Sequence, residues 1–164
     1  MGRDKTPVTA AVRQLRAEKV VFEDHPYTYE EKGGTAVSAR ELGVDEHFVI
    51  KTLVMEDERK NPLIVLMHGD LQVSTRELAR VIGVKQVSPC PADTAQRHSG
   101  YLVGGTSPFG MRRQMTVYME ESIAGLERIY INGGKRGYLV SMAPDELIRV
   151  LKPVPVKVGI PSLS

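Results

Sequence analysis

The sequence predicts a single α/β domain built around a curved, mixed sheet with helices on its flanks. Three observations lead to this prediction. The chain of 164 residues suits one domain of ordinary size. Apolar strand-like runs interleave with helical segments, but the strands outnumber the helices needed for a simple parallel βαβ series. Two pairs of strands are joined by links typical of hairpins, which indicates antiparallel pairing.

Helices are predicted from apolar spacing and from the residues typical of helix ends. The first follows Thr6, which can cap it, and has Pro7 at its favoured first position. The second and third each stop at a glycine suited to a helix C-cap, Gly43 and Gly83. The expected helices span residues 7–18, 36–42, 74–82, 92–98 and 144–151.

Short strands are predicted from runs rich in apolar and β-branched residues. A charged link containing proline joins two of them as a hairpin, and the turn at residues 133–136 joins the last two as another. The expected strands span residues 20–22, 48–55, 63–67, 84–87, 101–103, 116–119, 128–132 and 137–142. We expect the domain to cover residues 1–152, followed by a proline-rich tail over 153–164 without regular structure.

Composition narrows the class of protein. Hydrophobic residues make up 41% and charged residues 26%, which is typical of a folded globular chain. Cys90 is the single cysteine, so no intramolecular disulfide can form, and we expect a packed bystander rather than a nucleophile. No segment has the apolar length of a membrane span or signal sequence, so a cytoplasmic protein without membrane contact is expected.

Common catalytic signatures are missing. The chain has neither the glycine-rich phosphate loop G-x-x-x-x-G-K-[ST] nor the nucleophile elbow G-x-S-x-G. Its histidines show no metal-ligand spacing, so no metal site is expected, and His68 is expected at the surface end of a strand. The histidines are His25, His47, His68 and His98.

The segment at residues 100–110, Gly-Tyr-Leu-Val-Gly-Gly-Thr-Ser-Pro-Phe-Gly, is the strongest candidate for a binding loop. Glycines let backbone N–H groups approach a ligand, although a plain tight turn uses the same residues. Basic residues lie near this and the later glycine cluster, where they could hold phosphates or form a solvated face. They are Arg112, Arg113, Lys135 and Arg136, although the net charge of +2 alone does not argue for nucleic acid.

Two side chains stand out elsewhere. Lys51 interrupts an apolar strand, so it faces either solvent or a pocket in which its ammonium could bind phosphate or polarise a carbonyl. Tyr27, two residues after His25 in an extended segment, could bind a substrate or be a half-buried aromatic residue.

The chain resembles the YbaK/ProX family of free-standing aminoacyl-tRNA deacylases, which are relatives of the prolyl-tRNA synthetase editing domain. Its closest resemblance is to the YbaK branch, which acts on Cys-tRNA(Pro). The resemblance spans roughly residues 6 to 151. It rests on Thr6-Pro-Val8, Phe22-Glu-Asp-His-Pro-Tyr27, Lys51-Thr-Leu53, the loop at residues 100–110, Thr116-Val117 and Ile129-Tyr-Ile-Asn-Gly-Gly-Lys-Arg-Gly137.

The resemblance implies a mixed sheet curled into a partial barrel and hydrolysis of the ester that joins a mischarged amino acid to the 3′ adenosine of tRNA. It implies no metal and no cofactor, a pocket lysine at Lys51, and a substrate whose own thiol attacks the ester in the YbaK branch. The implied substrate-binding residues are Tyr27, Gly104, Gly105, Thr106, Ser107, Pro108 and Gly134. It also implies two partners, the 3′ acceptor end of an aminoacyl-tRNA and prolyl-tRNA synthetase in a transient complex.

The sequence departs from the family pattern in two places, at residues 28–35 and within the glycine loop. Thr106 and Phe109 stand where the family has Ile and Leu, so the size or polarity of the pocket could differ. Two alternatives therefore stay open. One is a deacylase with another specificity, such as Ala-tRNA(Pro), and the other is a non-catalytic module that binds tRNA or a nucleotide.

Overall fold

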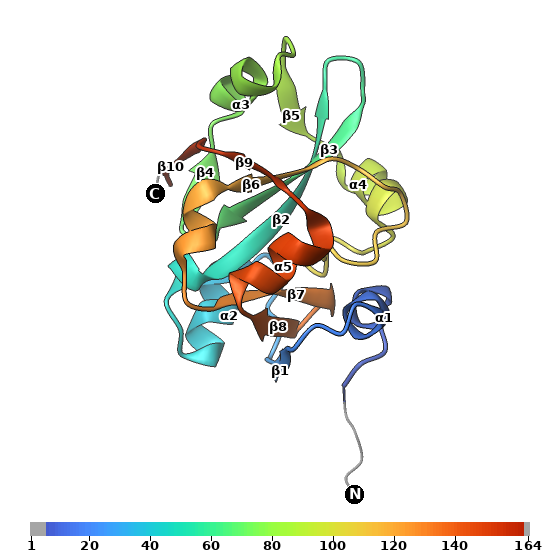
Figure 1. Cartoon of the computed structure of the whole chain (residues 1–164), viewed down its shortest axis with the longest axis vertical. Coiled ribbons are helices and arrows are strands. Elements are labelled where there is room, and N and C mark those ends of the chain that lie inside the picture. Colours follow the sequence, from blue (N-terminus) through green and yellow to red (C-terminus); the bar gives the residue numbers. More distant parts are fainter. Residues whose placement is uncertain (1–5, 163–164) are drawn as a thin grey trace, which may run out of the picture.

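The computed structural model describes residues 6–162 and is organised around one large mixed sheet (Figure 1). The strand order is β1-β8-β7-β2-β3-β6-β9, with β5 also paired to β2, and a separate small sheet joins β10 to β4. The strands are β1 (Glu23–Pro26), β2 (Val49–Asp57), β3 (Pro62–His68), β4 (Leu71–Val73), β5 (Val87–Pro89), β6 (Val117–Glu120), β7 (Ile129–Lys135), β8 (Tyr138–Met142), β9 (Val154–Val156) and β10 (Gly159–Pro161).

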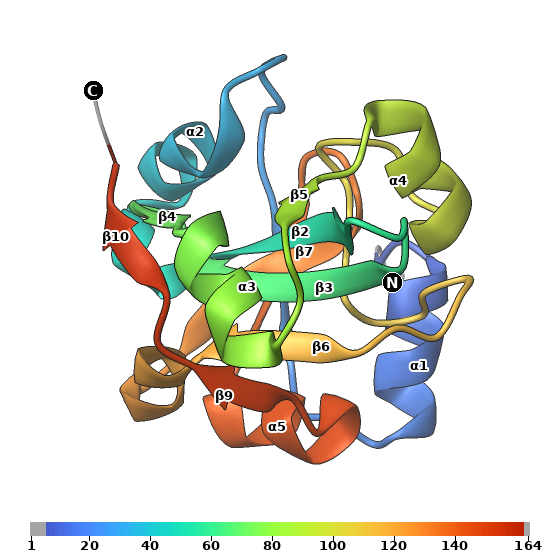
Figure 2. The same ribbon diagram turned by 90° about the horizontal axis from the view of Figure 1, so that it is seen from above.

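Helices cover both sides of the central strands, and Figure 2 shows α2 and α4 on the side opposite α5. The helices are α1 (Ala10–Ala17), α2 (Gly34–Leu42), α3 (Thr75–Ile82), α4 (Ala92–Ser99) and α5 (Pro144–Leu151), with 3-10 turns at η1 (Glu46–Phe48) and η2 (Glu121–Gly125). None of the helices in the described part of the chain has the length and apolar character needed to cross a bilayer.

The pairing confirms the predicted α/β domain with a mixed sheet. Strands β2 and β3 form the expected antiparallel hairpin, and so do β7 and β8. Between these hairpins β2 runs parallel to β7, and β3 runs parallel to β6. The sheet is therefore assembled from two local hairpins that meet through a parallel β2–β7 contact.

Side chains of β2 alternate between two apolar clusters. Ile50 and Val54 belong to the main core, which also receives the buried face of α1. Met55 belongs to a second cluster on the opposite face of the sheet, together with Leu78 of α3. The alternation follows from the two-residue period of a strand, and it fixes the face to which each neighbouring residue points.

The helix-end predictions are partly confirmed. Gly43 and Gly83 both have the left-handed conformation at the ends of α2 and α3, as predicted. The predicted cap of the first helix is wrong, since Thr9 rather than Thr6 caps α1 by accepting a bond from the Val12 N–H at 3.0 Å. The Thr9 hydroxyl also donates to the Gly133 carbonyl at 2.6 Å, so a tertiary contact decides where this helix begins.

Two strand predictions and the prediction of an irregular tail are wrong, and the strand expected at residues 84–87 lies instead at Val87–Pro89. The first strand begins at Glu23 instead of residue 20 and pairs with β8. Residues 101–103 form a loop rather than a strand, because the buried Tyr101 hydroxyl closes this segment by donating to the Phe109 carbonyl at 2.5 Å. The tail is also ordered into strands, since β9 pairs with β6 and β10 with β4 while the side chains of Val156 and Val158 are buried.

Candidate functional site

A cavity of about 720 Å³ opens at a gap in the sheet beside β2. Strand β7 pairs with β2 only at Val49 and Ile50, and β5 pairs with it only from Met55 to Asp57. Between these two ladders β2 keeps β3 on one side and has no strand on the other. The gap leaves room for a ligand beside an open strand edge.

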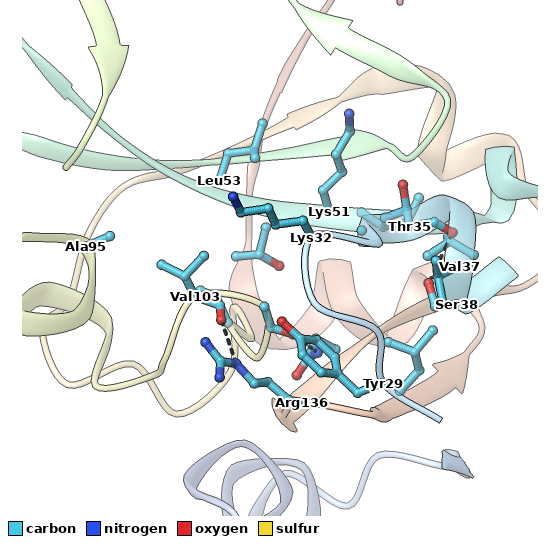
Figure 3. Close-up of a pocket in the computed structure, with 18 of the residues that line it drawn as sticks. Tyr29, Lys32, Thr35, Val37, Ser38, Lys51, Leu53, Ala95, Val103 and Arg136 are labelled. Carbon is cyan, nitrogen blue, oxygen red and sulfur yellow. Dashed lines mark hydrogen bonds between the residues drawn. The ribbon is translucent and has the colours of Figure 1, made fainter. Parts of the chain in front are cut away.

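The cavity extends around both faces of this edge. Lys51 and Thr52 both line it, and neighbouring residues of a strand point to opposite faces. Figure 3 shows the Lys51 side chain extending away from Tyr29 and Arg136. A ligand that contacts both Lys51 and the residues 103–106 loop must therefore lie across the edge of β2.

Lys51 is partly buried at the cavity wall. Burial lowers the pKa of its ammonium, and the carboxylates of Glu46 and Asp70 oppose that shift. Within residues 6–162, no carboxylate lies within 4.0 Å of the Lys51 Nζ, so the ammonium forms no ion pair with these residues. Such a cation can interact with an electron-rich ligand atom.

The glycine loop is fixed by contacts with the β7–β8 hairpin. The Arg136 Nε donates to the Val103 carbonyl at 2.9 Å, and the Asn132 Nδ2 donates to the Gly104 carbonyl at 3.2 Å. The Arg136 guanidinium also lies 5.4 Å from the centroid of the Tyr29 ring, a cation–π contact. These contacts hold one wall of the cavity in place.

Gly104 is the cavity-lining glycine of this loop, and its conformation and surroundings favour glycine. Its φ is +93°, and an added Cβ would lie 2.6 Å from the Tyr29 Oη. The side chain of Tyr29 can pack against the loop only because this position has no Cβ.

Gly104 and Thr106 are the loop residues of the expected set that line the cavity. Gly105 and Ser107 are buried behind that surface, as is Pro108. The Gly105 N–H already donates to the Leu102 carbonyl at 2.9 Å, so it is not directed at a ligand. The loop thus offers fewer backbone donors than its glycine content suggests.

Gly134 lies behind the cavity wall. Its N–H donates to the Asn132 Oδ1 at 2.7 Å, and an added Cβ would meet Tyr101 and Thr9. Gly134 therefore supports the hairpin that holds the loop and does not line the cavity. Phe109 is fully buried in the main core, so its bulk does not change the pocket.

Tyr27 lines the cavity from the segment between β1 and α2. Its backbone N–H donates to the Gly137 carbonyl at 2.9 Å, which fixes the segment against the β7–β8 turn. Burial raises the pKa of the Tyr27 phenol, so the group stays protonated and can donate a hydrogen bond.

Several lining residues were not expected from the sequence. Arg136 had a signal, because it is basic and follows a glycine cluster. Thr52 and Asn132 lie within segments on which the family resemblance rests, but neither was singled out, and the other residues come from separate segments that only the fold brings together. Besides Arg136, the unexpected residues are Tyr29, Lys32, Thr35, Ser38, Thr52, Cys90, Ala95 and Asn132.

Cys90 lines the cavity, a position that no pattern in the sequence predicts. Its Sγ donates to the Glu56 Oε1 at 3.6 Å. Burial, reinforced by that carboxylate, raises the pKa of Cys90 to about 11. The thiol is therefore protonated near neutral pH, which supports the prediction that it is not a nucleophile.

Alkylation tests this assignment. We expect iodoacetamide to modify Cys90 in the folded protein at pH 8 at least about 100-fold more slowly than in urea-unfolded chain, because few thiolates are present. The folded rate should rise roughly tenfold per pH unit between pH 8 and pH 10. Equal rates in the folded and unfolded protein would show that the thiol is not protected by its surroundings.

His47, His68 and Asp70 form the one cluster of possible metal ligands found among the described residues. The two imidazoles stack with centroids 3.7 Å apart and planes 3° from parallel. Ring lone pairs in parallel planes do not converge on one ion, and His68 already binds the His47 carbonyl and Ser122 through its two nitrogens. The cluster is better explained as a structural contact.

His68 corrects one sequence prediction. It was expected at the surface, but its side chain is fully buried, and burial lowers its pKa. The neutral ring is held by both hydrogen bonds, so a strand-end histidine has become part of the packed interior.

Comparison with known proteins finds similarity over most of the chain. The family model described as the aminoacyl-tRNA editing domain matches residues 30–150. EbsC of Enterococcus faecalis, provisionally named a Cys-tRNA(Pro)/Cys-tRNA(Cys) deacylase, is 29% identical over 150 residues, which are 90% of this chain and 92% of EbsC. A proline–tRNA ligase of Thermodesulfovibrio yellowstonii is 34% identical over 84 residues, which are 51% of this chain and 14% of the ligase.

Solved structures share the fold. The hypothetical protein APE2540 superposes with a TM-score of 0.84 at 21% identity, covering 92% of this chain and 99% of that chain. A protein provisionally described as a trans-editing enzyme for prolyl tRNA synthetase superposes with a TM-score of 0.80 at 17% identity, covering 94% and 99%. At these identities the similarity concerns the architecture alone.

Proposed function

The chain belongs to the aminoacyl-tRNA editing domain family, and we propose that it is a deacylase that hydrolyses the aminoacyl ester of mischarged tRNA, with Cys-tRNA(Pro) as its substrate. One observation carries this proposal. The matched residues 30–150 supply every residue that lines the cavity except Tyr27 and Tyr29. The name of EbsC, which is similar over nearly the whole chain, supports the choice of substrate.

In this proposal Lys51 is the catalytic residue. Attack on an ester builds negative charge on the carbonyl oxygen, and a fixed cation in a partly dry site stabilises that charge. Lys51 is partly buried and has no carboxylate partner within 4.0 Å in the described chain, so its ammonium is available for this task. The Gly104 and Thr106 wall would hold the other side of the aminoacyl end across the edge of β2.

The nucleophile is proposed to come from the substrate. The thiol sulfur of the bound cysteine attacks its own ester carbon, and the bond from that carbon to the 3′ oxygen of the adenosine breaks. The 3′ oxygen takes up the proton that the thiol releases, and water then opens the cyclic thioester. Cys90 is not needed, because its own thiol holds its proton to about pH 11.

Four exposed basic residues follow the glycine loop or form the turn that contacts it, and one of them, Arg136, lines the cavity; we propose that they bind the acceptor end. Arg112 and Arg113 follow the glycine loop, while Lys135 and Arg136 form the turn that contacts it. Throughout residues 6–162, no carboxylate lies within 4.0 Å of these four cations. They can therefore neutralise phosphates near the 3′ end.

A transient complex with prolyl-tRNA synthetase is part of the same proposal. Segments of proline–tRNA ligases are similar to this chain, which supports the choice of that synthetase as the partner. A tRNA substrate also implies action in the cytoplasm.

A deacylation panel tests the function. Purified protein is incubated with Cys-tRNA(Pro), Cys-tRNA(Cys), Ala-tRNA(Pro) and Pro-tRNA(Pro), and release of each amino acid is followed with time. We expect cysteine to be released from tRNA(Pro) at least about tenfold faster than alanine, since alanine lacks the attacking thiol. Faster release of alanine would refute the specificity, and binding without cleavage of any ester would indicate a non-catalytic module.

A further inference from the structure

The open edge of β2 presents the backbone of Thr52 to the cavity. The Val54 carbonyl accepts a bond from the Cys90 N–H at 3.1 Å, and Ile50 pairs with Ile131 of β7. Backbone groups of residues two apart in a strand point to the same side. The N–H and carbonyl of Thr52 therefore face the same edge, where neither neighbouring ladder reaches them.

The Thr52 side chain is also unpaired. Its Oγ1 is buried and, among the described residues, is the one buried side-chain polar atom without a hydrogen-bond partner. A buried hydroxyl that makes no hydrogen bond costs stability, and native proteins rarely keep one without a reason. Thr52 lines the cavity, and rotation about its χ1 angle exchanges the positions of its hydroxyl and its other Cβ substituents, so a ligand in the cavity can become the partner of the hydroxyl.

The surroundings of Thr52 fit a small side chain with one polar atom. Val54, Cys90 and Ala95 line the cavity and pack on the same core cluster as this face of β2. Glu30 and Glu31 are the carboxylates that line the described cavity, and they lie on the segment before α2. A ligand ammonium would therefore find its counter-charge there rather than beside Thr52.

Resting on the proposed function, we infer that the Thr52 hydroxyl binds the side-chain thiol of the aminoacyl group and thereby selects cysteine over alanine. A hydroxyl can both donate to sulfur and accept from a thiol. Thr52 acts in this way as a positioning residue, because it holds the sulfur that attacks the ester without itself entering the reaction. Lys51, on the opposite face of β2, acts on the carbonyl.

Binding of two non-cleavable probes tests the inference. The probes are 3′-amino-3′-deoxyadenosine carrying either cysteine or alanine through an amide bond, and their Kd values are measured by calorimetry. Thr52→Val removes the hydroxyl at nearly constant volume, and Thr52→Ser keeps it. We expect Thr52→Val to weaken binding of the cysteinyl probe by about 3- to 10-fold and to leave the alanyl probe unchanged, while Thr52→Ser retains the preference for cysteine.

Thermal unfolding of the ligand-free variants gives a second readout. Thr52→Val should raise the Tm, because it removes a buried unpaired hydroxyl, whereas a purely structural hydroxyl would lower the Tm when lost. The assignment would be overturned if Thr52→Val left the affinity for both probes unchanged or lowered it equally for both. It would also be overturned if the wild type did not prefer the cysteinyl probe. Since the probes are not cleaved, a Thr52-dependent preference without any ester hydrolysis would refute the proposed function alone.

Discussion

Replacing Lys51 with methionine is expected to lower kcat/KM for Cys-tRNA(Pro) by about 100-fold or more, because the cation that stabilises the carbonyl oxygen is lost. The protein should remain folded. The methionine stem can occupy the space of the lysine stem, and the removed ammonium is one that burial disfavours, as its lowered pKa indicates. Single-turnover deacylation and urea unfolding of the same preparations measure the two effects.

The matched control for this prediction is Lys51→Arg, which keeps the positive charge. It should recover part of the lost activity, although the larger guanidinium does not fit the site equally well. Full activity in Lys51→Met would exclude the catalytic role. Loss of folding in Lys51→Met, with activity retained in Lys51→Arg, would instead assign Lys51 to structure.

The lowered pKa of Lys51 also predicts the pH dependence. The folded pKa lies below the unfolded value, so between the two the unfolded chain binds more protons and stability rises with pH. The ammonium needed for catalysis is lost over the same interval. As the pH rises toward 10.5, the unfolding free energy of the wild type should therefore increase relative to that of Lys51→Met. Over the same pH range the activity of the wild type should decline.

Gly110→Ala is expected to lower the free energy of unfolding by about 3 kcal/mol through backbone strain and overpacking. Gly110 has a φ of +65°, and an added Cβ would lie 2.4 Å from the carbonyl carbon and oxygen of Ala10. Those atoms belong to the backbone of α1 and cannot move alone. The change would also disturb the bond from the Gly110 N–H to the Gln14 Oε1 at 2.6 Å.

Gly125→Ala is the matched control, since an added Cβ there meets no atom within 4 Å. Its free energy of unfolding should stay within about 0.5 kcal/mol of the wild-type value. Urea denaturation of the wild type and both variants measures the difference. Similar stability of the two variants would show that α1 can withdraw from the loop at little cost.

The regular elements could be predicted where local chemistry decides them. Gly43 and Gly83 end their helices in the left-handed C-cap conformation. This conformation is a local property of the backbone that glycine favours, so the sequence alone predicts it. The tail could not be predicted in this way. Its strand β9 forms because β6 offers an unpaired edge and a place to bury Val156, which are properties of distant parts of the chain.

The candidate site likewise has a part that the sequence predicts and a part that depends on the fold. Lys51 stands out in the sequence as a charge within an apolar strand, and Gly104 stands out within a glycine loop. Neither residue predicts the gap between β7 and β5 that forms the cavity, because that gap depends on where the β2–β7 and β2–β5 pairings end. For this reason the sequence does not indicate that the side chains of Thr52 and Cys90 lie at a cavity.

Local sequence patterns were sufficient to predict the α/β class, the two hairpins, the lysine in an apolar strand and the resemblance that pointed to tRNA editing. Tertiary contacts were needed to show which glycine-loop residues line the cavity and that Phe109 belongs to the core. The tertiary structure also places Lys51 on the opposite side of β2 from the residues 103–106 loop. Local patterns record backbone preference and polarity, whereas the shape of a cavity depends on contacts between segments far apart in the chain.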